Sequence, residues 1–149
     1  MANTANNMKP LVLLDVDGVI NDLGALYGLP RPHTINVVAT NGYRVEIPDY
    51  MPGLIQHFVA TCEVWWCTTW RNAANREIAD HLGIPHLPVI DDGTDVRAVS
   101  WKPAAAAPAA AAALAEGRTV LWIEDFYGTP PIGAMPPGVI FVDTATTPD

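Results

Sequence analysis

The fold is decided by residues 11–21, Leu-Val-Leu-Leu-Asp-Val-Asp-Gly-Val-Ile-Asn. Four consecutive apolar residues, 11–14, are typical of a central parallel strand that is buried on both faces. Asp15 and Asp17 follow the strand directly, and open α/β folds keep their functional sites at this carboxyl edge of the sheet. Two unpaired carboxylates would repel each other there, so a cation should join them. A hard divalent ion such as Mg²⁺ is the natural candidate because it prefers oxygen ligands.

Length and composition indicate one compact domain over residues 1–149. Half of the residues are apolar and 16% are charged, which suits a folded α/β domain rather than a disordered chain. No apolar run approaches the roughly 18 residues that a membrane span needs, so no membrane partner is expected. Residues 1–10 are polar and are expected to form a loose leader rather than a secretory signal, which implies a cytoplasmic location.

The net charge of −8 arises from 16 acidic and 8 basic residues. This balance disfavours non-specific binding to nucleic acid, although it is compatible with a locally basic site. Cys62 and Cys67 are expected to be packed free thiols, because disulfides are rare in a reducing compartment.

Turn residues divide the remainder of the chain into alternating strands and helices. Strands are predicted at 63–67, 87–90, 119–123 and 139–142, and helices at 52–61, 71–82 and 104–116. Gly83 should end the second helix, and Pro108 should lie in the first turn of the third helix or kink it. A hairpin is predicted from 34–40 and 43–48, with a type I′ turn at Asn41-Gly42. It belongs to a small insertion, 21–51, that would act as a minimal cap or flap.

This order of elements favours an α/β fold in which helices cover both faces of a parallel sheet. The expected architecture is a Rossmann-like three-layer sandwich with a five-stranded parallel sheet and the small β-hairpin insertion. Because parallel strands end at one edge, polar residues that follow different strands should converge there. These residues are Asp15 and Asp17, Thr68, and Glu124 and Asp125, and Lys102 lies in a loop-to-helix junction on the same side.

That set resembles the four sequence motifs of the haloacid dehalogenase superfamily of phosphatases and phosphotransferases. The first motif, Asp-x-Asp-x-(Thr/Val), matches 15–19, and the other three are a strand-ending Thr or Ser, a Lys and an acidic pair. The fourth departs slightly, since Glu124 stands where an aspartate is usual. The resemblance covers residues 11 to about 142. The stretches 15–21, 66–75, 82–85, 101–102 and 122–125 are further similar to the small phosphatase domain of Swiss Army Knife RNA repair proteins.

The resemblance implies a role for each residue that also suits its chemistry. Asp15 would attack phosphorus and form an aspartyl-phosphate. Asp17 would protonate the leaving oxygen and later accept a proton from water, and its backbone carbonyl would bind the metal. Lys102 and Mg²⁺ would offset the charge of the phosphate. Thr68 would donate a hydrogen bond to a phosphoryl oxygen, aided by free N–H groups at the start of the helix expected from Arg71.

The remaining candidate residues surround this centre. Asp125 is the expected direct metal ligand, with Glu124 nearby. Gly18 would let the backbone bend sharply and approach the substrate closely. Thr69 is the alternative to Thr68. Arg71 is a candidate either for binding substrate phosphate or for capping or pairing on the helix surface.

Each motif also has a simpler explanation. Asp-x-Asp-Gly is compatible with a plain turn, Lys102 with a solvated surface lysine, and Glu124-Asp125 with a capping pair. The tryptophans near the motifs are expected mainly to pack in the core or at its rim rather than to stack on bases. The four histidines show no metal-ligand spacing.

The sequence therefore predicts a Mg²⁺-dependent phosphatase that hydrolyses a phosphomonoester, with a nucleotide or a polynucleotide end as the favoured substrate by resemblance. A phosphotransferase and a catalytically inactive binding module with the same fold are the alternatives.

Overall fold

The computed structural model describes residues 8–21, 34–94 and 99–145. Three predicted features fall partly outside these ranges. They are the leader at 1–10, of which 1–7 lie outside, the insertion at 21–51, of which 22–33 lie outside, and the loop before Lys102, of which 95–98 lie outside.

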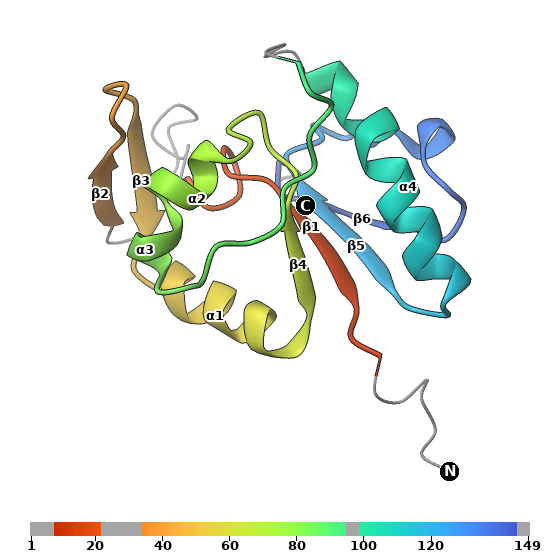
Figure 1. Ribbon diagram of the computed structural model, residues 1–149. Coiled ribbons are helices and arrows are strands. Elements are labelled where there is room, and N and C mark those ends of the chain that lie inside the picture. Colours follow the sequence, from red (N-terminus) through yellow and green to blue (C-terminus); the bar gives the residue numbers. More distant parts are fainter. Residues whose placement is uncertain (1–7, 22–33, 95–98, 146–149) are drawn as a thin grey trace.

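A four-stranded parallel sheet forms the centre of the described structure (Figure 1). Its strands, in spatial order, are β4 (Glu63–Trp66), β1 (Leu11–Leu14), β5 (Val120–Glu124) and β6 (Ile140–Asp143). The predicted α/β class with a central β1 is confirmed. β1 is fully buried along its length, as its unbroken apolar run requires.

The prediction of a fifth parallel strand at 87–90 is wrong. This segment contributes one isolated bridge, Trp66 to Val89, with hydrogen bonds from Trp66 N to Pro88 O (2.9 Å) and from Ile90 N to Trp66 O (2.8 Å). Pro88 has no N–H to donate, so a regular ladder cannot continue through it.

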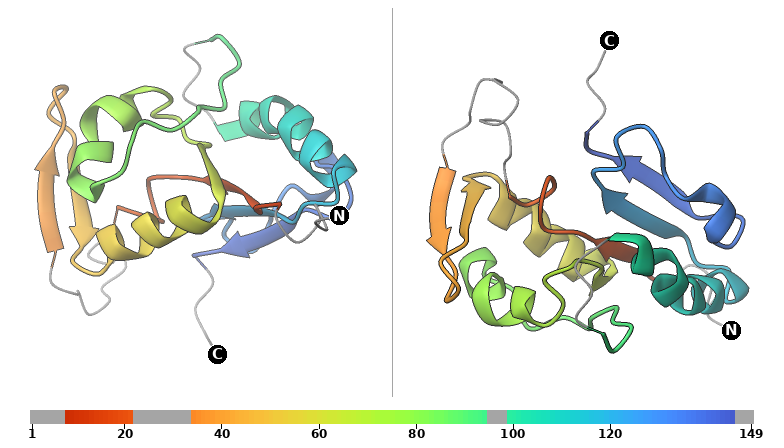
Figure 2. Two further views of the ribbon diagram at one scale, coloured as in Figure 1. Left: turned by 60° about the horizontal axis from the view of Figure 1, so that its bottom comes forward. Right: turned by 90° about the horizontal axis from the view of Figure 1, so that it is seen from above.

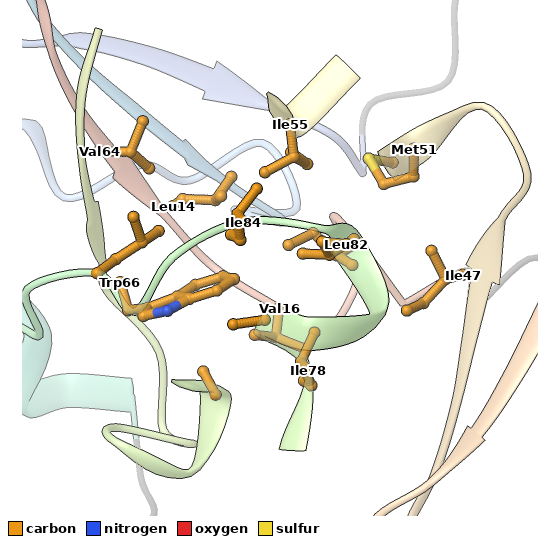
Figure 3. Packing of buried hydrophobic residues seen from close by; sticks show 14 of the residues in the cluster. Leu14, Val16, Ile47, Met51, Ile55, Val64, Trp66, Ile78, Leu82 and Ile84 are labelled. Carbon is orange, nitrogen blue, oxygen red and sulfur yellow. The ribbon is translucent and has the colours of Figure 1, made fainter. Parts of the chain in front are cut away.

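Helices cover both faces of the sheet and give three layers. α1 (Met51–Thr61), α2 (Ala73–Glu77) and α3 (Ala79–Leu82) lie on one face, and α4 (Lys102–Ala115) lies on the other (Figure 2). The side chains of β1 alternate between two cores, with Val12 and Leu14 facing the three short helices and Leu11 and Leu13 facing α4. Figure 3 shows the first core, where Leu14 lies near Ile55 and Ile84, and Val16 lies near Ile78.

α4 packs closely against the sheet because its buried positions are small. Ala106, Ala110 and Ala113 share a core with Trp122. The helix begins at Lys102, two residues earlier than predicted, after the 3-10 helix η3 (Val99–Trp101). Pro108 therefore lies in the helix interior rather than in its first turn. Its position is exposed, so water can satisfy the carbonyl group that the missing N–H leaves without a partner.

The helix predicted at 71–82 is interrupted. Arg71 has φ 50°, which no right-handed helix accepts, so α2 starts only at Ala73. Ile78 has φ −122° and separates α2 from α3. Gly83 ends α3 in the left-handed conformation, as predicted.

The predicted hairpin is confirmed, but its turn differs. β2 (Thr34–Val38) and β3 (Arg44–Pro48) pair antiparallel and lie at the opposite end of the molecule from α4 (Figure 1). Among the described residues, Asn41 is not one of those with positive φ, so a type I′ turn is excluded. Instead, Gly42 N donates to Ala39 O (2.8 Å) and Gly42 follows the turn with φ 85°.

A further 3-10 helix, η4 (Ile132–Ala134), lies between β5 and β6. Within the ranges described, no helix has the length and apolar character needed to cross a membrane.

Candidate active site

The register of the sheet aligns the carboxyl ends of β4, β1 and β5 at one edge. Leu14 lies opposite Trp66 of β4 and opposite Ile123 of β5. The next residue, Asp15, donates its N–H to Ile123 O (3.2 Å), and Cys67 N donates to Leu14 O (2.8 Å). The predicted convergence at the carboxyl edge is therefore confirmed.

Three carboxylates meet at this edge. Asp15, Glu124 and Asp125 each offer an oxygen, and these oxygens all lie within 4.8 Å of one another. Asp15 is 5% exposed and Glu124 is 6% exposed, whereas Asp125 is half-buried. The side chain of Asp17 does not join this group.

Lys102 is the cation inside the cluster. Its Nζ lies 2.7 Å from Glu124 Oε1 and 3.4 Å from Asp15 Oδ1, and the side chain is 2% exposed. Burial alone would lower the pKa of Lys102, but the two carboxylates outweigh burial and raise it. A solvated surface lysine is thus excluded.

One ammonium does not offset three carboxylates. Burial raises the pKa of Asp15 to about 7, although Lys102 and a hydrogen bond from Thr68 act in the opposite direction. Burial likewise raises the pKa of Glu124 and of Asp125 against the effect of Lys102. Without further positive charge, the cluster therefore tends to hold protons.

Glu124 also keeps a buried oxygen without a well-formed hydrogen bond. Its Oε1 accepts the hydrogen bond from Lys102, while Oε2 is buried and makes no well-formed hydrogen bond, although the Trp122 side chain is near enough to lower the pKa of Glu124. An ionised oxygen in this state is costly unless a cation reaches it. The donor set, with carboxylate oxygens only, suits a hard divalent ion. The residues therefore fit a metal, and Glu124 is as strong a candidate ligand as Asp125.

Gly18 makes room for Asp125. It has φ 80°, and a Cβ added there would lie 2.5 Å from Asp125 Oδ2. Only glycine satisfies both the left-handed backbone and the close approach of the carboxylate. The expected bend is therefore confirmed, while contact of Gly18 with substrate stays a prediction.

Thr68 is the hydroxyl that the fold brings to the centre. It is fully buried, and its hydrogen bond lowers the pKa of Asp15. Its Oγ1 also accepts a hydrogen bond from Trp70 N (3.2 Å). Thr69 follows at the turn and is half-buried.

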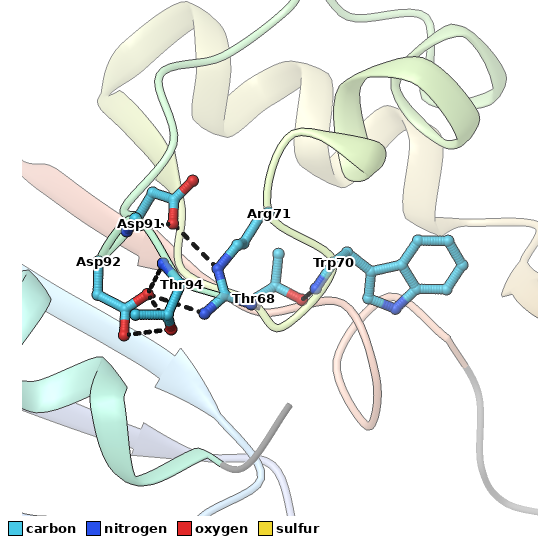
Figure 4. A network of polar contacts seen from close by, with 7 residues as sticks. Thr68, Trp70, Arg71, Asp91, Asp92 and Thr94 are labelled. Atoms are coloured by element: carbon cyan, nitrogen blue, oxygen red, sulfur yellow. Dashed lines mark hydrogen bonds and ion pairs between the residues drawn. The ribbon is translucent and has the colours of Figure 1, made fainter. Parts of the chain in front are cut away.

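Arg71 is paired with acidic residues. Its guanidinium lies 3.0 Å from Asp91 and 3.0 Å from Asp92 (Figure 4), and its Cζ lies 4.2 Å from the ring centre of Trp101. The predicted pairing is confirmed, but not on a helix surface, because Arg71 precedes α2 and both partners lie on a loop. The predicted free N–H groups are not all available, since Arg71 N donates to Thr68 O and Ala73 N to Trp70 O, both at 3.0 Å.

Asp17 lies beside the cluster, and its carboxylate is held by two residues that sequence reasoning missed. Asn21 Nδ2 donates to Asp17 Oδ1 (2.9 Å), and Trp70 Nε1 donates to Asp17 Oδ2 (3.0 Å). Both residues stand inside the motif stretches 15–21 and 66–75. Their positions were a usable signal, but the direction of an indole or an amide group is not encoded locally.

The other tryptophans and the cysteines behave as predicted. Trp66, Trp101 and Trp122 are buried in the cores. Cys62 and Cys67 are free thiols, and burial raises the pKa of Cys67, which disfavours the reactive thiolate form.

No protein-family model, curated protein or solved structure matches the chain.

Proposed function

We propose that the protein is a Mg²⁺-dependent phosphatase of the haloacid dehalogenase type that hydrolyses a phosphomonoester through an aspartyl-phosphate on Asp15. One observation carries the proposal. Two buried carboxylates, Asp15 and Glu124, and the half-buried Asp125 meet the buried ammonium of Lys102 at the carboxyl edge of the sheet, and one oxygen of Glu124 makes no well-formed hydrogen bond. This arrangement is costly as a purely structural device and useful for binding a metal ion and a phosphate.

In the proposed reaction, Asp15 supplies the nucleophile. A carboxylate oxygen of Asp15 bonds to phosphorus while the bond from phosphorus to the ester oxygen breaks. Asp17 gives its proton to that oxygen, which leaves as an alcohol. Asp17 then takes a proton from a water molecule, which attacks the aspartyl-phosphate and releases inorganic phosphate and Asp15.

Lys102 and Thr68 support the attack. The ammonium of Lys102, 3.4 Å from Asp15 Oδ1, reduces the repulsion between this carboxylate and an approaching phosphate. Thr68 would donate its hydroxyl hydrogen to a phosphoryl oxygen. Asp15, Glu124 and Asp125 would hold the Mg²⁺ with the Asp17 carbonyl, and the bound ion would offset phosphate charge.

The favoured substrate is a nucleotide or a phosphorylated polynucleotide end. This part of the proposal rests on the resemblance of the motif stretches to RNA repair phosphatases. Arg71, Thr69 and Gly18 are the proposed contacts with the substrate, and Arg71 would first have to exchange its acidic partners for phosphate.

The test is hydrolysis of p-nitrophenyl phosphate with and without Mg²⁺ by wild type, Asp15→Asn and the control Asp80→Asn. Asp80 is an exposed aspartate on α3. We expect Asp15→Asn to lower kcat at least about a thousandfold and Asp80→Asn to leave it unchanged. Equal rates for wild type and Asp15→Asn would favour the inactive binding module. Transfer of phosphate to added glycerol in preference to water would favour the phosphotransferase.

A further inference from the structure

Both carboxylate oxygens of Asp17 are held by N–H donors from different segments. Asn21, at the end of the loop after β1, donates to Oδ1 at 2.9 Å. Trp70, in the turn after β4, donates its indole N–H to Oδ2 at 3.0 Å across 53 positions of sequence. Two donors of fixed direction define the plane of the carboxylate.

The hairpin supports both donors. Glu46 N in β3 donates to Asn21 Oδ1 (2.8 Å), which orients the amide group so that its nitrogen faces Asp17. The ring of Tyr43 packs edge-on to Trp70, with centroids 5.5 Å apart. Burial, and then the charge of the neighbouring Asp17, raises the pKa of the Tyr43 phenol.

Packing alone does not explain this arrangement. A half-buried tryptophan such as Trp70 can leave its N–H to water, as an indole at a core rim commonly does. Here the N–H and the Asn21 amide are both directed to one carboxylate. Asp17 is the carboxylate from which the proposed reaction requires a proton transfer along a defined line.

We propose that Trp70 and Asn21 are positioning residues that aim Asp17 at the leaving oxygen of the substrate. The inference rests on the proposed function. Neither residue touches the reacting atoms, and each acts through the direction of the Asp17 carboxylate.

Misdirection of a general acid has a distinctive kinetic effect. An alkoxide is a poor leaving group and needs the proton as its bond to phosphorus breaks, whereas p-nitrophenolate leaves without it. Loss of a positioning donor should therefore harm hydrolysis of alkyl phosphates more than hydrolysis of p-nitrophenyl phosphate. A general disturbance of the site would harm both equally.

The experiment compares Trp70→Phe, Asn21→Asp and the control Trp65→Phe on p-nitrophenyl phosphate and on glycerol 2-phosphate, with Mg²⁺. Phe keeps an aromatic ring without the N–H, and Asp keeps the shape and the Oδ1 acceptor of Asn21 without the donor. Trp65 is half-buried in β4, and its N–H is bonded to Glu63 (2.8 Å) away from the site.

We expect Trp70→Phe and Asn21→Asp to lower kcat/KM for glycerol 2-phosphate roughly ten- to a hundredfold. The loss should lie in kcat rather than in KM, and p-nitrophenyl phosphate should lose much less. Trp65→Phe should match wild type on both esters.

Two results would overturn the inference while the proposed function stands. They are equal losses on the two esters, and no loss on either ester in both variants. If wild type with Mg²⁺ hydrolyses neither ester, the proposed function fails, and the positioning role fails with it. Two variants in separate segments keep the test decisive if one of them does not fold.

Discussion

Lys102 is one of two lysines in the chain. Among the described residues it is the one basic side chain that is buried, and it lies 2.7 Å from a carboxylate oxygen of Glu124. Replacing it with Met keeps most of the packing volume and leaves Asp15 and Glu124 buried without their cation. Breaking a buried pair in this way costs about 3–5 kcal/mol. We expect the free energy of unfolding, measured with urea at pH 8 without Mg²⁺, to fall by this amount.

The control for this prediction is Lys9→Met, which changes the other lysine at an exposed position. This variant should leave the midpoint of urea unfolding unchanged. Equal stabilities for the two variants would mean that Lys102 is not needed to neutralise the cluster.

The raised pKa of Asp15, about 7 against an ordinary 3.8, makes metal-free stability depend on pH. A carboxyl that binds its proton more tightly when folded stabilises the fold below its unfolded pKa. It loses that contribution as pH rises from about 4 to about 7. A divalent cation competes with the same protons. The rise in Tm caused by Mg²⁺ should therefore be larger at pH 8 than at pH 5, and smaller at pH 8 in Asp15→Asn. A rise that is independent of pH would contradict the argument.

At the scale of elements, the end of α3 offers a prediction about backbone conformation. Gly83 has φ 69°, and a Cβ there would lie 2.7 Å from Gln56 Nε2, which donates to Leu82 O. We expect Gly83→Ala to destabilise the protein by about 1–2 kcal/mol. In α1, Gly53 has open space around it, so Gly53→Ala should stabilise the protein by about 0.5–1 kcal/mol. Thermal unfolding measures both changes, and effects of the same sign would refute the argument.

Local sequence patterns were sufficient to predict some of these helices and strands but not others. The strands of the sheet were predicted from apolar runs, and α1 from its periodicity, because these signals are local. The 87–90 strand failed because Pro88 has no N–H to donate to a neighbouring strand, a restriction that the apolar pattern alone does not express. The 71–82 helix failed because the left-handed Arg71 and the departure of Ile78 from helical geometry depend on tertiary contacts.

At the scale of the whole molecule, topology explains why the convergence of the candidate site residues was predictable. Once parallel strands are assumed, Asp15, Thr68 and Glu124 must come to one edge, whatever their separation in sequence. The contacts that orient Asp17 were not predictable, because they depend on how the hairpin packs against the Trp70 turn. The exposure of Ile140 (50%) and Val142 (39%) in β6 was also not predictable, since an edge strand and a central strand can share one apolar pattern.

The net charge of −8 is the property of the whole molecule that bears on the proposed substrate. An acidic protein repels an approaching polyanion. Added salt shortens the range of this repulsion, because the screening length is only about 10 Å at 0.1 M salt. A mononucleotide carries less charge and should be affected less. We compare kcat/KM for a nucleoside 5′-monophosphate and for a 5′-phosphorylated oligonucleotide of about a dozen residues, between about 20 and 150 mM salt. The ratio of oligonucleotide to mononucleotide should rise severalfold as salt increases. A ratio that falls would instead show that basic side chains near the site neutralise the backbone phosphates, so that a local patch outweighs the net charge of the protein.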